Sequence, residues 1–260
     1  MDSYDEFAGV YDLLMDNVPY KEWVHSIINE LRTAGIGDGL ILELGCGTGT
    51  VCELMAEAGY DMTGVDNSPR MLDTANEKKR ISGHDILYLL QDMREFELYG
   101  TMRAIICICD SINYLTDKSD VLKCFKLVNN YLDPGGLFIF DFNTIHKYRD
   151  IIGDAVIAEN RDSCSFIWEN EFDDEEDIND CLLTIYSRRE DGAYERSEEE
   201  HVQRGYELSE IKELLSAAGL EYIKAWDGEG DGDISEADRL SRIFVTAREC
   251  TKKTTADRCE

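Results

Sequence analysis

The sequence predicts an α/β protein with a doubly wound, mostly parallel sheet of seven strands and a small antiparallel β insertion. Three observations favour this class. Apolar runs alternate with segments of helical period over residues 1–142, and this alternation returns after residue 207. A glycine-rich turn at residues 45–49 joins the first apolar run directly to a helical segment. Between residues 143 and 206 the pattern changes to short runs separated by polar turns, which is typical of an antiparallel insertion.

The strands of the main sheet are predicted from continuous apolar runs. A strand that is buried on both faces loses the alternation of polar and apolar residues, so such runs are typical of a parallel sheet covered by helices. The turn at Asp133–Gly136 leads into the fifth run. The expected strands lie at residues 41–44, 62–65, 86–90, 102–109, 137–140, 220–226 and 242–247.

Helices are predicted between these strands from apolar periodicity and from capping residues. Ser68 and Pro69 fit the N-cap and the first helical position of one helix. Gly59 and Gly219 fit the C-terminal ends of two others. The expected helices cover residues 20–32, 51–58, a segment from 69 onward, 117–132 and 208–218.

The insertion is expected to be a small sheet with strands at residues 165–169, 181–186 and 193–197. It is strongly acidic, since residues 159–200 hold 16 Asp and Glu against 4 Arg, and Asp173–Asp177 is expected to be a solvated loop. We therefore expect three parts: a main domain at 1–142 and 207–250, the insertion at 143–206, and a disordered tail at 251–260.

The net charge of −29 arises from 55 Asp and Glu against 26 Lys and Arg. A field of this sign repels nucleic acid and anionic membranes, so we expect neither as a partner. It is compatible with a neutral or cationic small-molecule substrate. No apolar run reaches the roughly 20 residues that cross a bilayer, and the acidic N-terminus is unlike a signal peptide.

The nine cysteines are scattered, and several lie in apolar or glycine-rich stretches where buried free thiols are the ordinary interpretation. Cys107 and Cys109 are separated by one residue rather than the two of a zinc or redox pair, so no metal site is expected. This cysteine usage indicates a reducing compartment, and we expect a cytoplasmic protein.

The turn at residues 45–49 is suited to hold a nucleotide-like cofactor. Gly45, Gly47 and Gly49 lack the Cβ atoms that would keep a ligand away from the backbone. The helix that follows directs its unpaired N–H groups toward the same turn.

Carboxylates occur at the ends of successive strands, where ligands bind in an open α/β sheet. Asp66 can accept hydrogen bonds from both hydroxyls of an adenosine ribose. Asp92 can accept from the adenine amino group while Met93 covers the ring, and Asp110 ends the fourth strand. Such a set indicates an adenosine-containing cofactor.

A dinucleotide-binding dehydrogenase would also carry a ribose-binding acid, and it is the main alternative. Its turn reads G-x-G-x-x-G. Here the sixth position of that pattern is Thr50, and Glu43 before the first glycine is foreign to it.

Together these residues resemble class I S-adenosylmethionine-dependent methyltransferases, which have a Rossmann-like fold. Leu42–Gly49 is similar to the family's first motif, Asp110 begins its fourth, and Asp133–Gly136 is similar to its turn before strand five. The resemblance implies S-adenosylmethionine as the cofactor. The implied cofactor-binding residues are Tyr11, Glu43, Gly45, Cys46, Gly47, Asp66, Asn67, Met71, Asp92, Met93 and Asp110.

The chain resembles more closely a bacterial subgroup of small-molecule-type methyltransferases with a β insertion after strand five. The segments that carry this resemblance are Tyr4–Asp12, Asp110–Leu115 and His201–Tyr206. The resemblance implies that the insertion covers the substrate side. In the first segment Tyr4, Phe7 and Tyr11 share one helical face, which either packs as a lid or brings Tyr4 or Tyr11 over the cofactor.

Methyl transfer from a sulfonium is an in-line displacement, so the protein mainly has to align the reactants and exclude water. A general base is needed only if the acceptor is protonated at neutral pH. We expect Tyr114, His201 and Tyr11 as catalytic residues, and Asn113, Tyr114, His201 and Arg204 as acceptor-binding residues. Two alternatives stay open: a structural role for His201, and pairing of Arg204 with carboxylates of the insertion.

The predicted function is therefore methyl transfer from S-adenosylmethionine to an unidentified small-molecule acceptor. One alternative is a methyltransferase that acts on protein or RNA, although the acidic charge disfavours RNA. Another is an NAD-type nucleotide-binding protein without methyl transfer.

Overall fold

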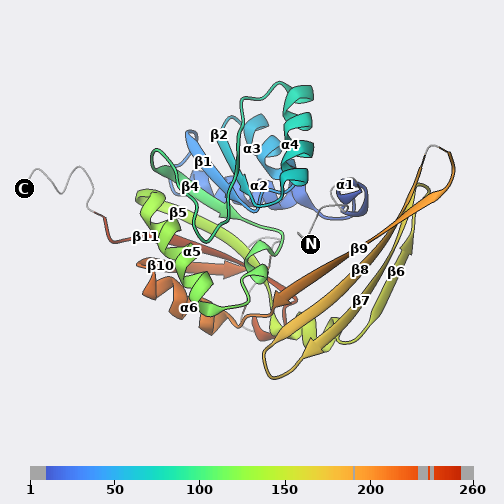
Figure 1. Cartoon of the computed structure of the whole chain (residues 1–260). Coiled ribbons are helices and arrows are strands. Elements are labelled where there is room, and N and C mark those ends of the chain that lie inside the picture. Colours follow the sequence, from blue (N-terminus) through green and yellow to red (C-terminus); the bar gives the residue numbers. More distant parts are fainter. Residues whose placement is uncertain (1–9, 190, 228–233, 235–236, 253–260) are drawn as a thin grey trace, which may run out of the picture.

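The computed structural model describes residues 10–189, 191–227, 234 and 237–252. Tyr4 and Phe7 of the predicted lid, most of the loop at 227–238, and residues 253–260 of the predicted tail lie outside the described residues. The chain forms a seven-stranded sheet and a four-stranded sheet. Figure 1 shows the smaller sheet projecting from the larger one, with α1 in the space between them.

The main sheet has the strand order β10-β11-β5-β4-β1-β2-β3. Strands β1 to β5 pair in parallel, whereas β11 is antiparallel to both β5 and β10. The predicted doubly wound, mostly parallel sheet is therefore confirmed. The strands are β1 Leu40–Leu44, β2 Asp61–Asp66, β3 Leu87–Leu90, β4 Met102–Cys107, β5 Leu132–Asn143, β10 Leu220–Trp226 and β11 Arg242–Glu249.

The strand order reverses between β1 and β4, which are hydrogen-bonded neighbours in the sheet. In open α/β sheets the loops at such a reversal separate to opposite faces, and ligands bind in the crevice outside the carboxyl ends of the strands. The glycine turn follows β1, and residues 108–115 follow β4. Both segments therefore border this crevice.

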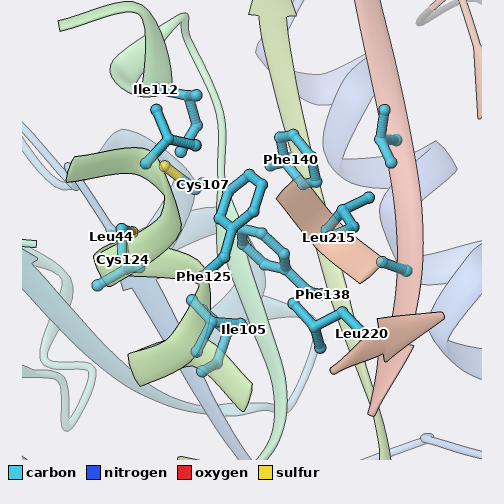
Figure 2. Packing of buried hydrophobic residues seen from close by; sticks show 14 of the residues in the cluster. Leu44, Ile105, Cys107, Ile112, Cys124, Phe125, Phe138, Phe140, Leu215 and Leu220 are labelled. Atoms are coloured by element: carbon cyan, nitrogen blue, oxygen red, sulfur yellow. The ribbon is translucent and has the colours of Figure 1, made fainter. Parts of the chain in front are cut away.

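Helices cover both faces of the main sheet (Figure 1). Buried residues of α2, α3 and α4 pack on one face, and those of α5 and α6 pack on the other. On the second face Phe125 of α5 packs against Phe138 and Phe140 of β5, with ring centroids 5.4 and 5.2 Å apart (Figure 2). The helices are α1 Tyr11–Leu14, α2 Tyr20–Thr33, α3 Thr50–Glu57, α4 Pro69–Ser82, α5 Lys118–Tyr131 and α6 Leu208–Ala217.

The capping residues act as the sequence predicts. The Ser68 side chain accepts a hydrogen bond of 3.3 Å from the backbone N–H of Met71 at the start of α4. Gly59 and Gly219, which follow α3 and α6, have the positive φ values of C-terminal glycines, 97° and 80°. None of the described helices combines the length and apolar character needed to cross a membrane.

The insertion between β5 and α6 forms an antiparallel sheet in the order β6-β7-β8-β9. The prediction of three short strands was wrong, because the structure has four, and β7 to β9 are longer than predicted. Along residues 198–203 of β9 buried and exposed positions alternate, but the buried side chains are Glu199, His201 and Gln203, so a search for apolar residues misses this part of the strand. Strand β6 is short and has no buried residue. The strands are β6 Val156–Asn160, β7 Cys164–Asp173, β8 Ile178–Arg188 and β9 Tyr194–Arg204.

Candidate active site

The glycine turn brings the backbone into close contact with the segment that follows β4. Gly45 has a φ of 66°, and a Cβ atom there would lie 2.4 Å from the Ser111 Oγ atom, so no larger residue fits without displacement. Gly47 has a φ of 51°, and a Cβ atom there would meet nothing within 4 Å. Gly47 therefore leaves an open face toward the adjoining cavity, which its backbone lines.

A cavity of about 420 Å³ lies outside the carboxyl ends of β1, β2 and β4. Its size is typical of sites for cofactors and small molecules. It brings together nine of the residues that the sequence predicts for the site: Tyr11, Gly45, Gly47, Asp66, Asn67, Met71, Asp92, Met93 and Tyr114. It is also lined by residues that the sequence analysis did not identify: Val65, Gln91, Arg94, Cys109, Ser111 and Leu115.

Asp66 connects the end of β2 to the glycine turn. Its Oδ2 atom accepts a hydrogen bond of 2.8 Å from the Gly47 N–H, and its Oδ1 atom accepts one of 2.8 Å from the Ser68 N–H. Burial raises the pKa of Asp66. Each carboxylate oxygen has a second lone pair, so the group can also accept hydrogen bonds from a ligand.

Asp92 at the far end of the cavity is paired with Arg94, the clearest residue missed by the sequence analysis. The Arg94 guanidinium donates to Asp92 Oδ2 at 2.6 Å and lies 3.2 Å from Asp120 of α5. This hydrogen bond lowers the pKa of Asp92. The sequence signal that could have identified Arg94 is its position, because a basic residue stands two positions after a predicted ligand-binding acid.

Glu43 and Cys46 lie behind the glycine turn and border a smaller cavity of about 30 Å³. The Glu43 side chain is buried, with only 3% of its surface exposed, and its Oε2 atom has no hydrogen-bond partner among the described residues. Burial raises the pKa of Glu43 to about 8. Burial therefore favours the neutral form of this carboxyl group next to the turn.

Tyr114 joins the cavity to the insertion. Its hydroxyl oxygen lies 3.0 Å from Nδ1 of His201 on β9. The Nε2 atom of His201 in turn lies 3.5 Å from Oε2 of Glu199, and both side chains are buried. A carboxylate, an imidazole and a phenol thus lead from the insertion to the cavity wall.

Further contacts hold residues 110–115 against residues 201–206. Gln203 Nε2 donates to Asp110 Oδ2 at 2.8 Å, and Asn113 Nδ2 donates to the Arg204 backbone oxygen at 2.7 Å. The Tyr206 hydroxyl donates to the Leu115 backbone oxygen. With the Tyr114–His201 contact, these bonds fix the end of β9 relative to the cavity.

Asn113, Arg204 and Asp110 are predicted site residues that, like His201, line neither of the two cavities. Asn113 is completely buried and directs its side chain to backbone groups. The Arg204 guanidinium pairs with Glu210 at 2.8 Å and lies 4.7 Å from the centre of the Tyr206 ring. Glu210 belongs to α6, so the closest partner of Arg204 lies outside the insertion, whereas Asp177 of the insertion lies 3.8 Å from it.

Asp110, the third of these residues, points away from the cavity into a buried charged cluster. It pairs with Arg242 at 2.5 Å, and Arg242 also binds Asp141 of β5. Burial by itself would raise the pKa of Asp110, but Arg242, Lys147 and the hydrogen bond from Gln203 together lower it. Cys109 and Asp110 have φ values of 61° and 52°, a costly conformation for non-glycine residues that is common at functional sites.

The segment that carries Tyr11 is attached to the glycine turn by Asp12. Thr48 Oγ1 donates to Asp12 Oδ1 at 2.7 Å, and Lys78 Nζ of α4 lies 2.6 Å from Asp12 Oδ2. Farther along, Arg161 of the insertion binds Asp16 with distances of 2.8 and 3.0 Å. Residues 11–16 therefore bridge the glycine turn and the insertion.

Comparison with known proteins identifies relatives over almost the whole chain. A family model described as "Methyltransferase domain" matches residues 41–136. "Putative methyltransferase YqeM" of Bacillus subtilis (strain 168) is 36% identical over 221 residues, which cover 84% of this chain and 86% of that protein.

Two solved structures are informative. That of a S-adenosylmethionine-dependent methyltransferase from Clostridium acetobutylicum ATCC 824 has 30% identity and a TM-score of 0.86, covering 95% of this chain and 99% of the other. CalS10 from Micromonospora echinaspora, an amino pentose methyltransferase solved with S-adenosylmethionine bound, has 16% identity and a TM-score of 0.71. The superposition covers 96% of this chain and 98% of the other, and it shows that the two folds are similar.

Proposed function

The chain belongs to the S-adenosylmethionine-dependent methyltransferases, and we propose that it transfers the methyl group to a small-molecule acceptor. The acceptor enters beside Tyr114, between residues 11–16 and the sheet β6–β9. One observation carries this proposal: Asp66, Gly47 and Tyr114 line the same cavity, so a donor-binding wall and a proton-accepting group face one space.

The donor half of the cavity fits S-adenosylmethionine, which supplies a methyl group on a positively charged sulfur. Gly45 and Gly47 leave room along the backbone for the methionine portion, and Asp66 binds the ribose hydroxyls. Asp92 and Met93 bind the adenine ring. Charge-assisted hydrogen bonds of this kind contribute about 1.5–3 kcal/mol each, roughly 10- to 150-fold in affinity.

Glu43 is assigned to the ammonium group of the donor's methionine. Its buried oxygen without a hydrogen-bond partner lies at the small cavity behind Gly45 and Gly47, which Tyr11 also lines. A neutral carboxyl group in this position can lose its proton when a cation arrives, because the cation stabilises the carboxylate.

The acceptor half is formed by Tyr114, His201 and Tyr11. The 3.0 Å contact between Tyr114 and His201 supports a proton acceptor at the cavity wall. In this proposal residues 143–206 cover the acceptor side, and Tyr11 and Tyr114 of the main domain face the acceptor from the other side. Of the insertion, only residues near the end of β9 then contribute to the chemistry.

A small acceptor is favoured over nucleic acid by the net charge of −29. CalS10, whose fold is similar, is an amino pentose methyltransferase, which is compatible with a small acceptor here. All described cysteines are free thiols, which supports a reducing, cytoplasmic location.

Calorimetry with S-adenosylmethionine, S-adenosylhomocysteine and NAD tests the donor assignment. We expect micromolar binding of the first two ligands and none of NAD. A screen of small metabolites for incorporation of labelled methyl groups then tests the acceptor class. Labelling of protein or RNA, with no labelled small molecule, would contradict the proposal.

A further inference from the structure

Glu199 is a buried carboxylate within an acidic run whose other members are exposed. Only 5% of its surface is accessible, whereas Glu198 and Glu200 on either side are exposed. Its position in the β8–β9 pairing explains the difference. Glu199 lies opposite Leu183, and His201 lies opposite Cys181, so both side chains share the face that packs toward Val10.

The contacts of Glu199 and Tyr114 select one tautomer of His201. Glu199 Oε2 lies 3.5 Å from His201 Nε2, a charge contact without hydrogen-bond geometry, and a nearby carboxylate favours a hydrogen on that nitrogen electrostatically. The other nitrogen, Nδ1, is then an acceptor for the Tyr114 hydroxyl at 3.0 Å. A phenol that donates its hydrogen retains oxygen lone pairs with which to accept another.

We propose that Glu199, His201 and Tyr114 form a proton path that serves an amine acceptor, which arrives as an ammonium ion. This inference rests on the proposed methyltransferase function and specifies its substrate class. Tyr114 contacts the acceptor. Glu199 does not line the cavity and acts through His201, so it is a positioning residue.

The proton balance of the reaction is simple. An N–H bond of the ammonium breaks, and its proton passes to Tyr114 Oη as the Tyr114 proton passes to His201 Nδ1. The imidazolium that forms is stabilised by the Glu199 carboxylate. The freed nitrogen lone pair forms the new N–C bond to the methyl group as the C–S bond breaks and its electron pair remains on sulfur.

The charges on this face favour a cation over an anion. Arg161, the basic residue of the adjoining β6–β7 turn, is already paired with Asp16 and Glu159, so it is neutralised. Glu199 is buried, where a charge is poorly screened by solvent and acts more strongly. A carboxylate or phenolate acceptor at Tyr114 would meet this negative charge.

Sinefungin provides a test that does not require the natural acceptor. In sinefungin a carbon replaces the donor's sulfur and bears an amine at the position of the transferred methyl group, whereas S-adenosylhomocysteine has neither the amine nor the methyl group. Calorimetry should show sinefungin binding at least fivefold more tightly than S-adenosylhomocysteine. In Glu199→Gln the ratio of the two affinities should fall to a quarter of its wild-type value or less. The affinity for S-adenosylhomocysteine should stay within twofold of the wild-type affinity.

Glu200→Gln is the matched control, since it makes the same change on the opposite face of β9 and should keep the wild-type ratio. A ratio that is unchanged in Glu199→Gln would overturn the inference. If neither ligand binds the wild-type protein, the proposed function itself fails, so the two failures are distinguishable.

A second measurement uses only the wild-type protein and is independent of variant folding. The chain has four histidines, so the nitrogen shifts of His201 can be resolved by NMR. We expect the neutral ring to carry its hydrogen on Nε2. A hydrogen on Nδ1 would overturn the proton path.

Discussion

The Oδ2 atom of Asp66 accepts a hydrogen bond of 2.8 Å from the backbone N–H of Gly47. The acid at the end of β2 therefore supports the glycine turn as well as facing the cavity. Because the Ser68 N–H binds the other oxygen, the same carboxylate also orders the start of α4. Loss of this group should affect the ligand-binding surface at two positions at once.

Asp66→Ala should weaken S-adenosylmethionine binding at least tenfold, since it removes the ribose contact and a support of the turn. Asp66→Asn retains one oxygen acceptor and should lose less affinity. Calorimetry measures both values, and circular dichroism checks that the fold is intact. Equal affinity of Asp66→Ala and the wild type would show that the ribose is bound elsewhere.

Glu43 should make the stability of the ligand-free protein depend on pH. Burial raises the pKa of Glu43 in the folded state to about 8, above the unfolded value near 4.5. The contribution of Glu43 to the free energy of unfolding is therefore fully present below pH 4.5 and is lost as the pH rises through 8. Between pH 5.5 and 7.5 this loss is roughly 2.5 kcal/mol. Glu43→Gln cannot ionise and should not show it.

Urea unfolding at the two pH values measures this effect as the difference between the wild type and Glu43→Gln. Glu57→Gln, an exposed substitution on α3, is the control and should follow the wild type. Parallel pH dependence of the wild type and Glu43→Gln would mean that Glu43 is already ionised in the folded protein.

Asn113→Ala should reduce stability rather than donor binding. Its side chain donates to the backbone oxygens of Asn143 and Arg204 at 2.9 and 2.7 Å and accepts from the Asn143 N–H at 2.8 Å. Removing these buried bonds should cost about 3 kcal/mol in the free energy of unfolding. S-adenosylmethionine affinity, measured by calorimetry, should stay within threefold. Unchanged stability with lost turnover would instead support direct contact with the acceptor.

The ion pair between Asp12 and Lys78 should contribute to donor affinity because it holds the Tyr11 segment over the cavity. Both side chains are partly exposed, so the pair is worth about 0.5–1 kcal/mol, roughly two- to fivefold in affinity. A double-mutant cycle with Asp12→Asn and Lys78→Met measures this coupling through S-adenosylmethionine binding. The coupling should decrease at high salt. Additive single effects would show that the pair does not hold the segment closed.

The main sheet and the donor half of the site could be predicted because their signals are local. Continuous apolar runs identified the parallel strands, and Asp66 and Asp92 lie at the end of one strand and two residues after the end of the next. The glycine turn required no tertiary information either. In such a fold, position along the strand already determines which residues meet at the crevice.

The acceptor half could not be predicted equally well because it depends on pairing. Glu199 lies in a run of three glutamates that looks solvated, and only its register opposite Leu183 shows that it is buried. Asn113 was expected to bind the acceptor, but the direction of its side chain is set by backbone groups distant in sequence.

The bonds between residues 110–115 and residues 201–206 also have an evolutionary consequence. They attach the end of β9 to the donor-binding half, and β8 pairs directly with β9, whereas β6 and β7 do not. Substitutions in β6 and β7 can accumulate without moving Tyr114 and His201. A lineage built on this framework can therefore exchange one acceptor for another by remodelling these two strands while the transfer chemistry is inherited intact.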